Sequence, residues 1–168
     1  DVTARKQAEE QAEFMMRELD HRVKNMLAVI LSICRITSKT ANDVESFADA
    51  FSARLDAMAR THSLLAQNRW HGTNLRELVN AEVLRQGGED QVTINGPDVS
   101  ISPSSAQSLS MLFHELTTNA IKYGALSTPE GSVDVTWRRA DEIDERVELQ
   151  WTEKGGPQTQ EPSRTGFG

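Results

Sequence analysis

Hydrophobic residues in the first forty positions follow the spacing of a helix. No Pro or Gly occurs before residue 40, and apolar side chains recur at steps of three and four. The residues on this seam are Met15, Leu19, Val23, Met26, Ile30 and Ile33, with Thr37 continuing the spacing. Such steps place side chains on one face of a helix. The pattern predicts a single helix from residue 1 to about residue 40.

A second apolar stripe begins after a short polar break. Asn42 and Asp43 can cap a helix, and Asp43 and Glu45 suit its first turn. The stripe consists of Phe47, Phe51, Leu55, Met58, His62 and Leu65. Two helices joined by a few residues form an antiparallel hairpin. Because each apolar face is too wide for one partner, we expect a four-helix bundle in a dimer.

The periodicity stops at residues 68–73, where we place the domain boundary. Asn74–Glu77 resembles a capping box and predicts a helix to about Gln86, which Gly87 and Gly88 end. Short alternating segments at 91–95 and 99–102 predict two strands.

The remaining pattern adds one long helix and a β-hairpin. The helix starts after Pro103 and ends near Gly124, and we expect its apolar residues to pack on the sheet; these are Leu109, Leu112, Phe113 and Leu116. Residues 131–138 and 146–152 alternate on either side of an acidic turn, as hairpin strands do. Helices followed by strands predict an α+β fold.

Composition excludes several classes of protein. The 168 residues carry a net charge of −7, which argues against a nucleic-acid binder. A single cysteine, Cys34, excludes a disulfide within the chain. No run approaches the roughly 18 apolar residues of a membrane span, so we expect a cytoplasmic location. The chain begins at Asp1 and ends at Gly168, and we interpret it as part of a longer protein.

His21 lies on the face of the first helix opposite the seam. With Met26 at 0°, a rotation of about 100° per residue puts His21 at about 220°. A neutral imidazole facing water can accept a phosphoryl group. Asp20 could fix its tautomer or take its proton, and Asn25 could position a water. On spacing alone, an ordinary solvated histidine is the commoner outcome, and that alternative stays open.

The long helix carries a second polar constellation. Glu115 and Asn119 are four residues apart and therefore share one face. A carboxylate and an amide suit Mg²⁺ and phosphate oxygens, and Lys122 can reach a phosphate as a point charge. The alternative is an amphipathic helix with a polar outer face.

The end of the last strand offers an acceptor for a base. Glu153 can accept a hydrogen bond from an exocyclic amine such as that of adenine, and Gly155 and Gly156 let the chain pass close to a flat ring. The ring of Trp151 could lie in the core or brace this pocket, and we expect the core. Farther along, the candidate phosphate contacts are Arg164, Gly166 and Gly168. No Walker-type or Gly-x-Gly-x-x-Gly phosphate loop is present.

Four segments together resemble a known family. They are Glu18–Asn25 (Glu-Leu-Asp-His-Arg-Val-Lys-Asn), His114–Ser127, which opens His-Glu-Leu-Thr-Thr-Asn, Trp151–Pro157 (Trp-x-Glu-x-Gly-Gly-Pro) and Gly166–Gly168. The set resembles the HWE family of bacterial sensor histidine kinases over nearly the whole chain. In addition, the first ten residues resemble the exit of a PAS sensor domain, which implies such a sensor upstream.

The resemblance assigns roles to single residues. His21 matches the phosphoacceptor, with Asp20 and Asn25 beside it. The residues that match the nucleotide site are His114, Glu115, Asn119 as the Mg²⁺ ligand, Lys122, Glu153, Gly155 and Gly156. Pro157 departs from the pattern, since many relatives have glycine there.

The resemblance also implies a domain plan and partners. Residues 1–14 would be a signalling helix, 15–68 a hairpin for dimerisation and phosphotransfer, and 73–168 an incomplete ATP-binding α/β sandwich. The implied cofactors are ATP and Mg²⁺, and the implied partners are a second copy and a response regulator receiver domain. The implied reaction is autophosphorylation of His21 followed by transfer to an aspartate. Two alternatives are a non-catalytic dimerisation and docking scaffold and an anti-sigma-type Ser/Thr kinase.

Overall fold

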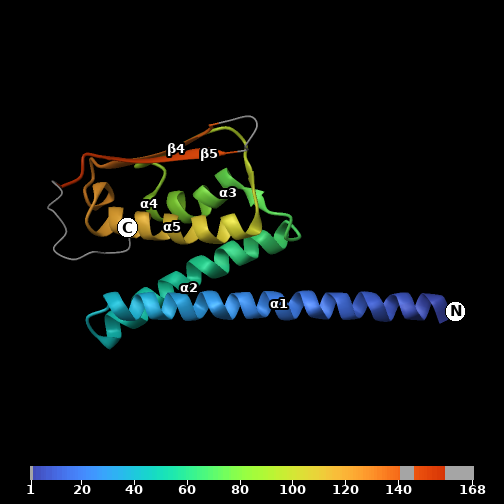
Figure 1. Cartoon of the computed structure of the whole chain (residues 1–168). Helices are drawn as coiled ribbons and strands as arrows, with labels where there is room; N and C mark the ends of the chain where they lie inside the picture. The colour runs from blue at the N-terminus through green and yellow to red at the C-terminus, as the bar shows by residue number, and fades with distance from the viewer. Residues whose placement is uncertain (1, 141–145, 158–168) are drawn as a thin grey trace. The chain divides into compact units, whose positions relative to one another are not determined.

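The computed structural model describes residues 2–140 and 146–157, which form an α+β protein (Figure 1). The chain divides into two compact units, residues 1–55 and 56–168. The second half of the second helix therefore groups with the strands rather than with the first helix. The predicted domain boundary at residues 68–73 begins directly after that helix ends at Gln67, and it lies inside the second unit.

Helix α1 and the first half of α2 form the first unit. Helix α1 runs from Val2 to Thr40, as the spacing predicted, and α2 runs from Val44 to Gln67. The Asp43 carboxylate accepts a hydrogen bond from the Ser46 N–H at 2.7 Å and so caps α2. The Arg54 guanidinium donates to Thr37 Oγ1 at 2.9 Å, so α2 contacts the last turns of α1.

The predicted seam on α1 separates into two halves. In the second half, Ile33 and Thr37 are buried. In the first half, Met15, Leu19 and Val23 are 56%, 58% and 52% exposed. The spacing thus predicted the buried face correctly where α2 covers α1, whereas the first half of the seam is an exposed apolar stripe.

Helical segments form one layer of the second unit. Helix α3 (Leu75–Val79), a π-helical turn η1 (Asn80–Leu84) and α4 (Arg85–Gly87) follow one another without a break. The Asn74 side chain accepts from the Arg76 N–H at 2.9 Å, as expected for a cap. Glu77, however, accepts from the hydroxyl of Thr73 at 2.9 Å, a bond that the capping-box pattern did not predict. Spacing alone did not predict the π-helical turn.

Three strands form the main sheet in the order β2-β4-β5. Strand β2 (Val92–Asn95) is parallel to β4 (Ser132–Arg139), which pairs antiparallel with β5 (Val147–Lys154). The predicted hairpin is confirmed, although its acidic turn lies outside the described residues. A separate pair joins β1 (Thr73–Asn74) to β3 (Ser100–Ile101).

Helix α5 (Pro103–Lys122) lies on the same side of the sheet as α3 and α4, and the 3₁₀ turn η2 (Ala125–Ser127) follows it (Figure 1). The Ser102 hydroxyl accepts from the Ser105 N–H at 3.2 Å and caps α5. Phe113 is fully buried, but Leu112 is 46% exposed, so the expectation that Leu112 packs on the sheet is wrong. Neighbouring helical residues point about 100° apart. Phe113 occupies the inward direction, and Leu112 therefore faces away.

The core of the second unit lies between these helices and the sheet. Its fully buried side chains include Leu75, Leu78, Val79, Val83, Phe113, Val133 and Val135. None of the helices in the described part of the chain is both long enough and apolar enough to cross a bilayer.

Candidate functional site

His21 lies on the exposed surface of α1, as its position opposite the seam predicted. In the described part of the chain, its ring forms no hydrogen bond with another residue. Helical ion pairs flank it: Arg22 pairs with Glu18 at 3.1 Å, and Lys24 with Asp20 at 2.6 Å. The imidazole is therefore open to an incoming electrophile, in a setting of balanced charge.

The two residues predicted to assist His21 differ in their contacts. The Asp20 carboxylate accepts a hydrogen bond from the Nζ of Lys24, one turn later on the helix. This ion pair holds the carboxylate on the side of Lys24. Asn25 is exposed. The roles of Asp20 as a base and of Asn25 as a water-positioning residue stay predictions.

The last two turns of α5 present the second set of predicted residues. Asn119 and Lys122 are exposed, Glu115 is half-buried, and His114 is 6% exposed. No other described residue forms a hydrogen bond or ion pair with the side chain of Asn119 or Lys122. An amide oxygen and an ammonium group are thus available on neighbouring turns of one helix, while His114 belongs to the buried face.

Glu153, at the end of β5, is held by two donors of the chain itself. Its Oε2 accepts from the Ala125 N–H at 2.8 Å, and its Oε1 accepts from Trp151 Nε1–H at 3.0 Å. A Cβ on Gly124 would overlap the Oε2 atom, so this glycine leaves the space that the carboxylate fills. The carboxylate therefore has a fixed place beside the turn that follows α5. Each oxygen keeps further acceptor capacity.

The glycines after Glu153 let two backbone segments approach closely. Gly155 has φ = +70°, and a Cβ there would lie 2.8 Å from the carbonyl oxygen of Glu130. A Cβ on Gly156 would lie 2.8 Å from the Ala125 nitrogen. The sequence predicted a close approach to a ligand at these positions. The close approach in the structure is to the protein's own backbone, at the turn that holds Glu153.

The donor set on α5 and β5 fits a magnesium nucleotide. An exposed amide and a nearby carboxylate, Asn119 and Glu115, suit a hard cation that also takes phosphate oxygens. The described residues hold no group of three His, Cys, Asp or Glu side chains that could form an all-protein metal site. A Mg²⁺ ion that takes some of its ligands from the phosphates of a nucleotide does not need three such side chains. Arg164, Gly166 and Gly168 lie outside the described residues.

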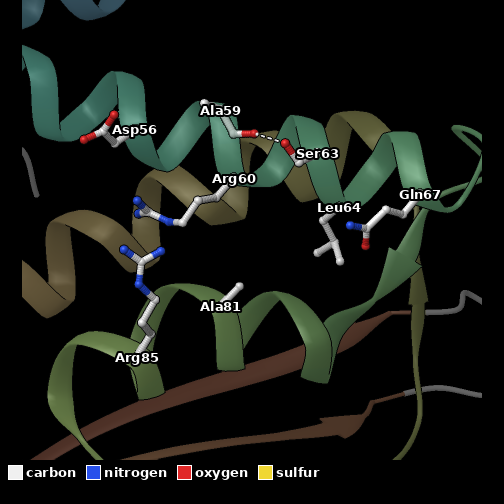
Figure 2. Close-up of a pocket in the computed structure, with 8 residues that line it drawn as sticks. All are labelled: Asp56, Ala59, Arg60, Ser63, Leu64, Gln67, Ala81 and Arg85. Atoms are coloured by element: carbon white, nitrogen blue, oxygen red, sulfur yellow. Dashed lines mark hydrogen bonds between the residues drawn. The ribbon is translucent and has the colours of Figure 1, made fainter.

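A groove of about 520 Å³ lies elsewhere in the second unit, between α2 and the η1–α4 segment (Figure 2). It is lined by Asp56, Ala59, Arg60, Ser63, Leu64, Gln67, Ala81 and Arg85. The guanidinium groups of Arg60 and Arg85 point toward each other across it (Figure 2). None of the predicted site residues lines this groove, so it is separate from the nucleotide candidate.

Arg60, which lines the groove, forms an ion pair with the buried Glu82. Its Nη2 and Nε contact the two carboxylate oxygens of Glu82 at 2.7 and 3.3 Å. Glu82 is fully buried on the π-helical turn, and burial raises its pKa, against the opposing effect of Arg60. Sequence reasoning missed this pair. The available signal was an acid at Glu82 among apolar positions of the helix.

Sequence reasoning also missed the contacts that orient Glu153. Gly124 was interpreted as the end of a helix, and Gly124 and Ala125 entered otherwise only as part of the family motif. Trp151 was expected in the core, with bracing of the pocket as the alternative. The ring of Trp151 does pack against the core, as predicted, but its N–H bonds Glu153. The signal was the two-residue spacing, since residues i and i+2 of a strand lie on one face.

Comparisons with known proteins agree with these motifs. Residues 18–98 match the model of the HWE histidine kinase family. A blue-light-activated histidine kinase of Brucella anthropi is 36% identical over 171 aligned positions, which cover all of this chain and 35% of that protein. Proteins of the same name from Brucella ovis and Brucella canis are 34% identical over the same span. The chain thus spans about a third of the length of these curated relatives.

The matched region includes His21, and the aligned relatives extend over α5 and β5, where the nucleotide candidate lies. Together these findings show that the chain belongs to the HWE family of sensor histidine kinases.

Proposed function

We propose that this chain phosphorylates itself on His21, using ATP and Mg²⁺, and passes the phosphoryl group to an aspartate on the receiver domain of a response regulator. The observation that carries the proposal is the exposed His21 ring, which no other described residue hydrogen-bonds. An exposed neutral imidazole can act as a nucleophile near neutral pH.

The nucleotide would occupy the end of β5 and the last turns of α5. Glu153 would accept from the amine of adenine, Asn119 and Glu115 would hold Mg²⁺, and Lys122 would contact a phosphate. When bound, magnesium ATP supplies the γ-phosphoryl group, whose transfer depends mainly on positioning and on the stabilisation of charge. In this proposal Gly155 and Gly156 shape the turn under the base. Beyond the described residues, Arg164, Gly166 and Gly168 are proposed to contact the phosphates.

The exposed stripe on α1 supports an assembly of two chains. Met15, Leu19 and Val23 are each more than half exposed and lie on one helical face. Exposed apolar stripes of this kind mark interaction sites. We propose that α1 and α2 form a hairpin that pairs with a second copy as a four-helix bundle, with residues 73–168 as the ATP-binding sandwich.

The input is proposed from the relatives and from the first residues. The relatives are named as blue-light-activated kinases, and they extend well beyond the matched region. A PAS-type sensor upstream of α1 would therefore control the kinase, with light as the proposed stimulus.

The test is incorporation of phosphate from γ-labelled ATP into the full-length protein. Wild-type protein is expected to become labelled, and Asn119→Ala to lose most of the label because the amide oxygen is gone. Ser108→Ala is the matched control, since Ser108 lies on the same helix and, among the described residues, its hydroxyl bonds only the Ser104 carbonyl oxygen one turn earlier. Equal labelling of Asn119→Ala and Ser108→Ala would refute the nucleotide site.

A docking scaffold without catalysis is the second candidate. The exposed apolar stripe favours it equally, because dimerisation needs no nucleotide. Calorimetric titration of the full-length protein with magnesium ATP separates the two, since a scaffold releases no heat of binding.

A further inference from the structure

Trp151 and Glu153 lie two residues apart on the same face of β5. Between them a hydrogen bond of 3.0 Å runs from the indole Nε1–H to the carboxylate Oε1. The other oxygen, Oε2, is bonded at 2.8 Å by the Ala125 N–H. The carboxylate thus receives one donor on each oxygen, from two different elements.

Both donors are fixed by packing. The Trp151 ring is partly buried against the core, and its register partner on β4 is the fully buried Val135. Ala125 is 1% exposed in the turn after α5, and its carbonyl accepts from Thr128 Oγ1 at 3.2 Å. Because neither donor can move far, the plane of the Glu153 carboxylate is set before any ligand arrives.

A carboxylate held in this way discriminates between hydrogen-bonding edges. When ionised it can only accept, and each oxygen retains a free acceptor direction. An exocyclic amine on a purine satisfies that direction, whereas a carbonyl oxygen at the same position meets a negative charge and receives no proton. A site built for one hydrogen bond rejects a ligand that cannot make it, because a polar group is left unpaired.

We propose that Trp151 is a positioning residue that makes Glu153 select a 6-amino purine over a 6-oxo purine. The indole N–H fixes one oxygen while the Ala125 N–H fixes the other. The inference rests on the proposed nucleotide function and adds the origin of its base specificity.

The experiment compares the dissociation constants of ATP and ITP for the full-length protein, by calorimetry with Mg²⁺. ITP carries a carbonyl in place of the amine and keeps the phosphates unchanged. A charged hydrogen bond of ordinary strength predicts that wild-type protein prefers ATP by about 10- to 100-fold. Trp151→Phe keeps an aromatic ring but loses the N–H. It should lower that preference at least about threefold, because a loosened carboxylate is less well preorganised.

Trp137→Phe is the matched control. The indole of Trp137 also donates to an oxygen, Pro97 O at 2.8 Å, and it lies on the neighbouring strand β4. That variant should keep the wild-type ATP-to-ITP ratio. If both variants lowered the ratio equally, the effect would be a general loss of packing and the positioning role would be overturned.

A second substitution keeps the test sharp if phenylalanine disturbs the fold. Benzothienylalanine at position 151 preserves the bicyclic ring and replaces the N–H with sulfur, and it should lower the ratio as Trp151→Phe does. An unchanged ratio in this protein would refute the positioning role while leaving nucleotide binding intact. If wild-type protein bound neither nucleotide, the proposed function and this inference would both fall, so the two failures are distinguishable.

Discussion

The first thirty residues of α1 and the junction of α5 with β5 are built in opposite ways. Surface pairs one turn apart flank the exposed His21 on α1, such as Lys24 with Asp20 at 2.6 Å, and pairs of this kind contribute about 0.3–0.5 kcal/mol each. At the junction, Glu153 is fixed by a backbone N–H and an indole from separate elements. A phosphoacceptor must be reachable, whereas a nucleotide site must be ordered before binding. The two regions meet these different demands.

The largest difference in stability is expected between a substitution in the core of the second unit and one on the exposed stripe of α1. Phe113→Ala should reduce the free energy of unfolding of the second unit by about 3–5 kcal/mol, because it empties a fully buried site. Leu19→Ala, on the exposed stripe of the first unit, should change the free energy of unfolding of that unit by no more than about 0.5 kcal/mol in dilute solution, followed by circular dichroism. Urea unfolding followed by tryptophan fluorescence reports on the second unit, since Trp70, Trp137 and Trp151 all belong to it.

The two substitutions should also differ in how their stability costs depend on protein concentration. If the stripe pairs with a second copy, the cost of Leu19→Ala should increase with concentration when helix content is followed by circular dichroism. The cost of Phe113→Ala should stay constant. A Leu19→Ala protein whose stability and association match those of the wild type at every concentration would contradict the proposed dimer.

Breaking an ion pair should likewise cost more stability in the interior of the second unit than on the surface of α1, and both costs should be smaller than that of Phe113→Ala. Arg60→Ala removes the bidentate partner of the buried Glu82 and should cost about 3 kcal/mol, at the low end for a buried pair because the groove admits water. Arg22→Ala breaks a surface pair and should cost less than about 1 kcal/mol. Urea midpoints of the two variants measure the difference, and equal costs would mean that Glu82 is well hydrated in solution.

The buried acid also predicts a dependence on pH. Burial raises the pKa of Glu82, so the folded state holds its proton more tightly than the unfolded state. Its contribution to stability is therefore complete below the ordinary value of 4.5 and is lost as pH rises through the raised pKa. The unfolding free energy of wild-type protein minus that of Glu82→Gln should decrease as pH increases from about 4 to 8. An increase over that range would contradict the raised pKa.

The smallest effect is expected at the cap of α2. The N–H of Ser46 lowers the pKa of Asp43, so the stabilisation is present above the ordinary value of 3.8 and is lost as pH falls through the lowered pKa. Asp43→Ala should speed hydrogen exchange in the first turn of α2 at neutral pH, whereas Asp43→Asn, which keeps an acceptor, should exchange like the wild type. Equal rates in all three proteins would rule out the cap.

Local patterns predicted the elements that local forces determine. The spacing of α1, the cap at Asp43 and the alternation of β4 and β5 all depend on near neighbours, and the structure confirms them. The parallel pairing of β2 with β4 joins segments forty residues apart, and no local signal indicates it. Leu112 was misassigned for a related reason, because an apolar helix has several candidate inner faces until the sheet selects one.

The candidate sites divide in the same way. The exposure of His21 followed from helical geometry alone. The orientation of Glu153 could not be predicted, because it depends on Gly124 and Ala125 reaching the end of β5 through tertiary packing. The buried pair of Arg60 with Glu82 likewise arises only when α2 packs against the π-helical turn.

The most direct test of the account is to locate the phosphate. Full-length protein incubated with magnesium ATP should carry one label that is stable to base, is lost in acid and maps to His21 by mass spectrometry. The label should disappear in His21→Ala and persist in His62→Ala, whose ring in the wild type packs edge-on against Trp70 at 4.7 Å between centroids. Acid-labile label that survives His21→Ala, or acid-stable label on serine or threonine, would contradict the account.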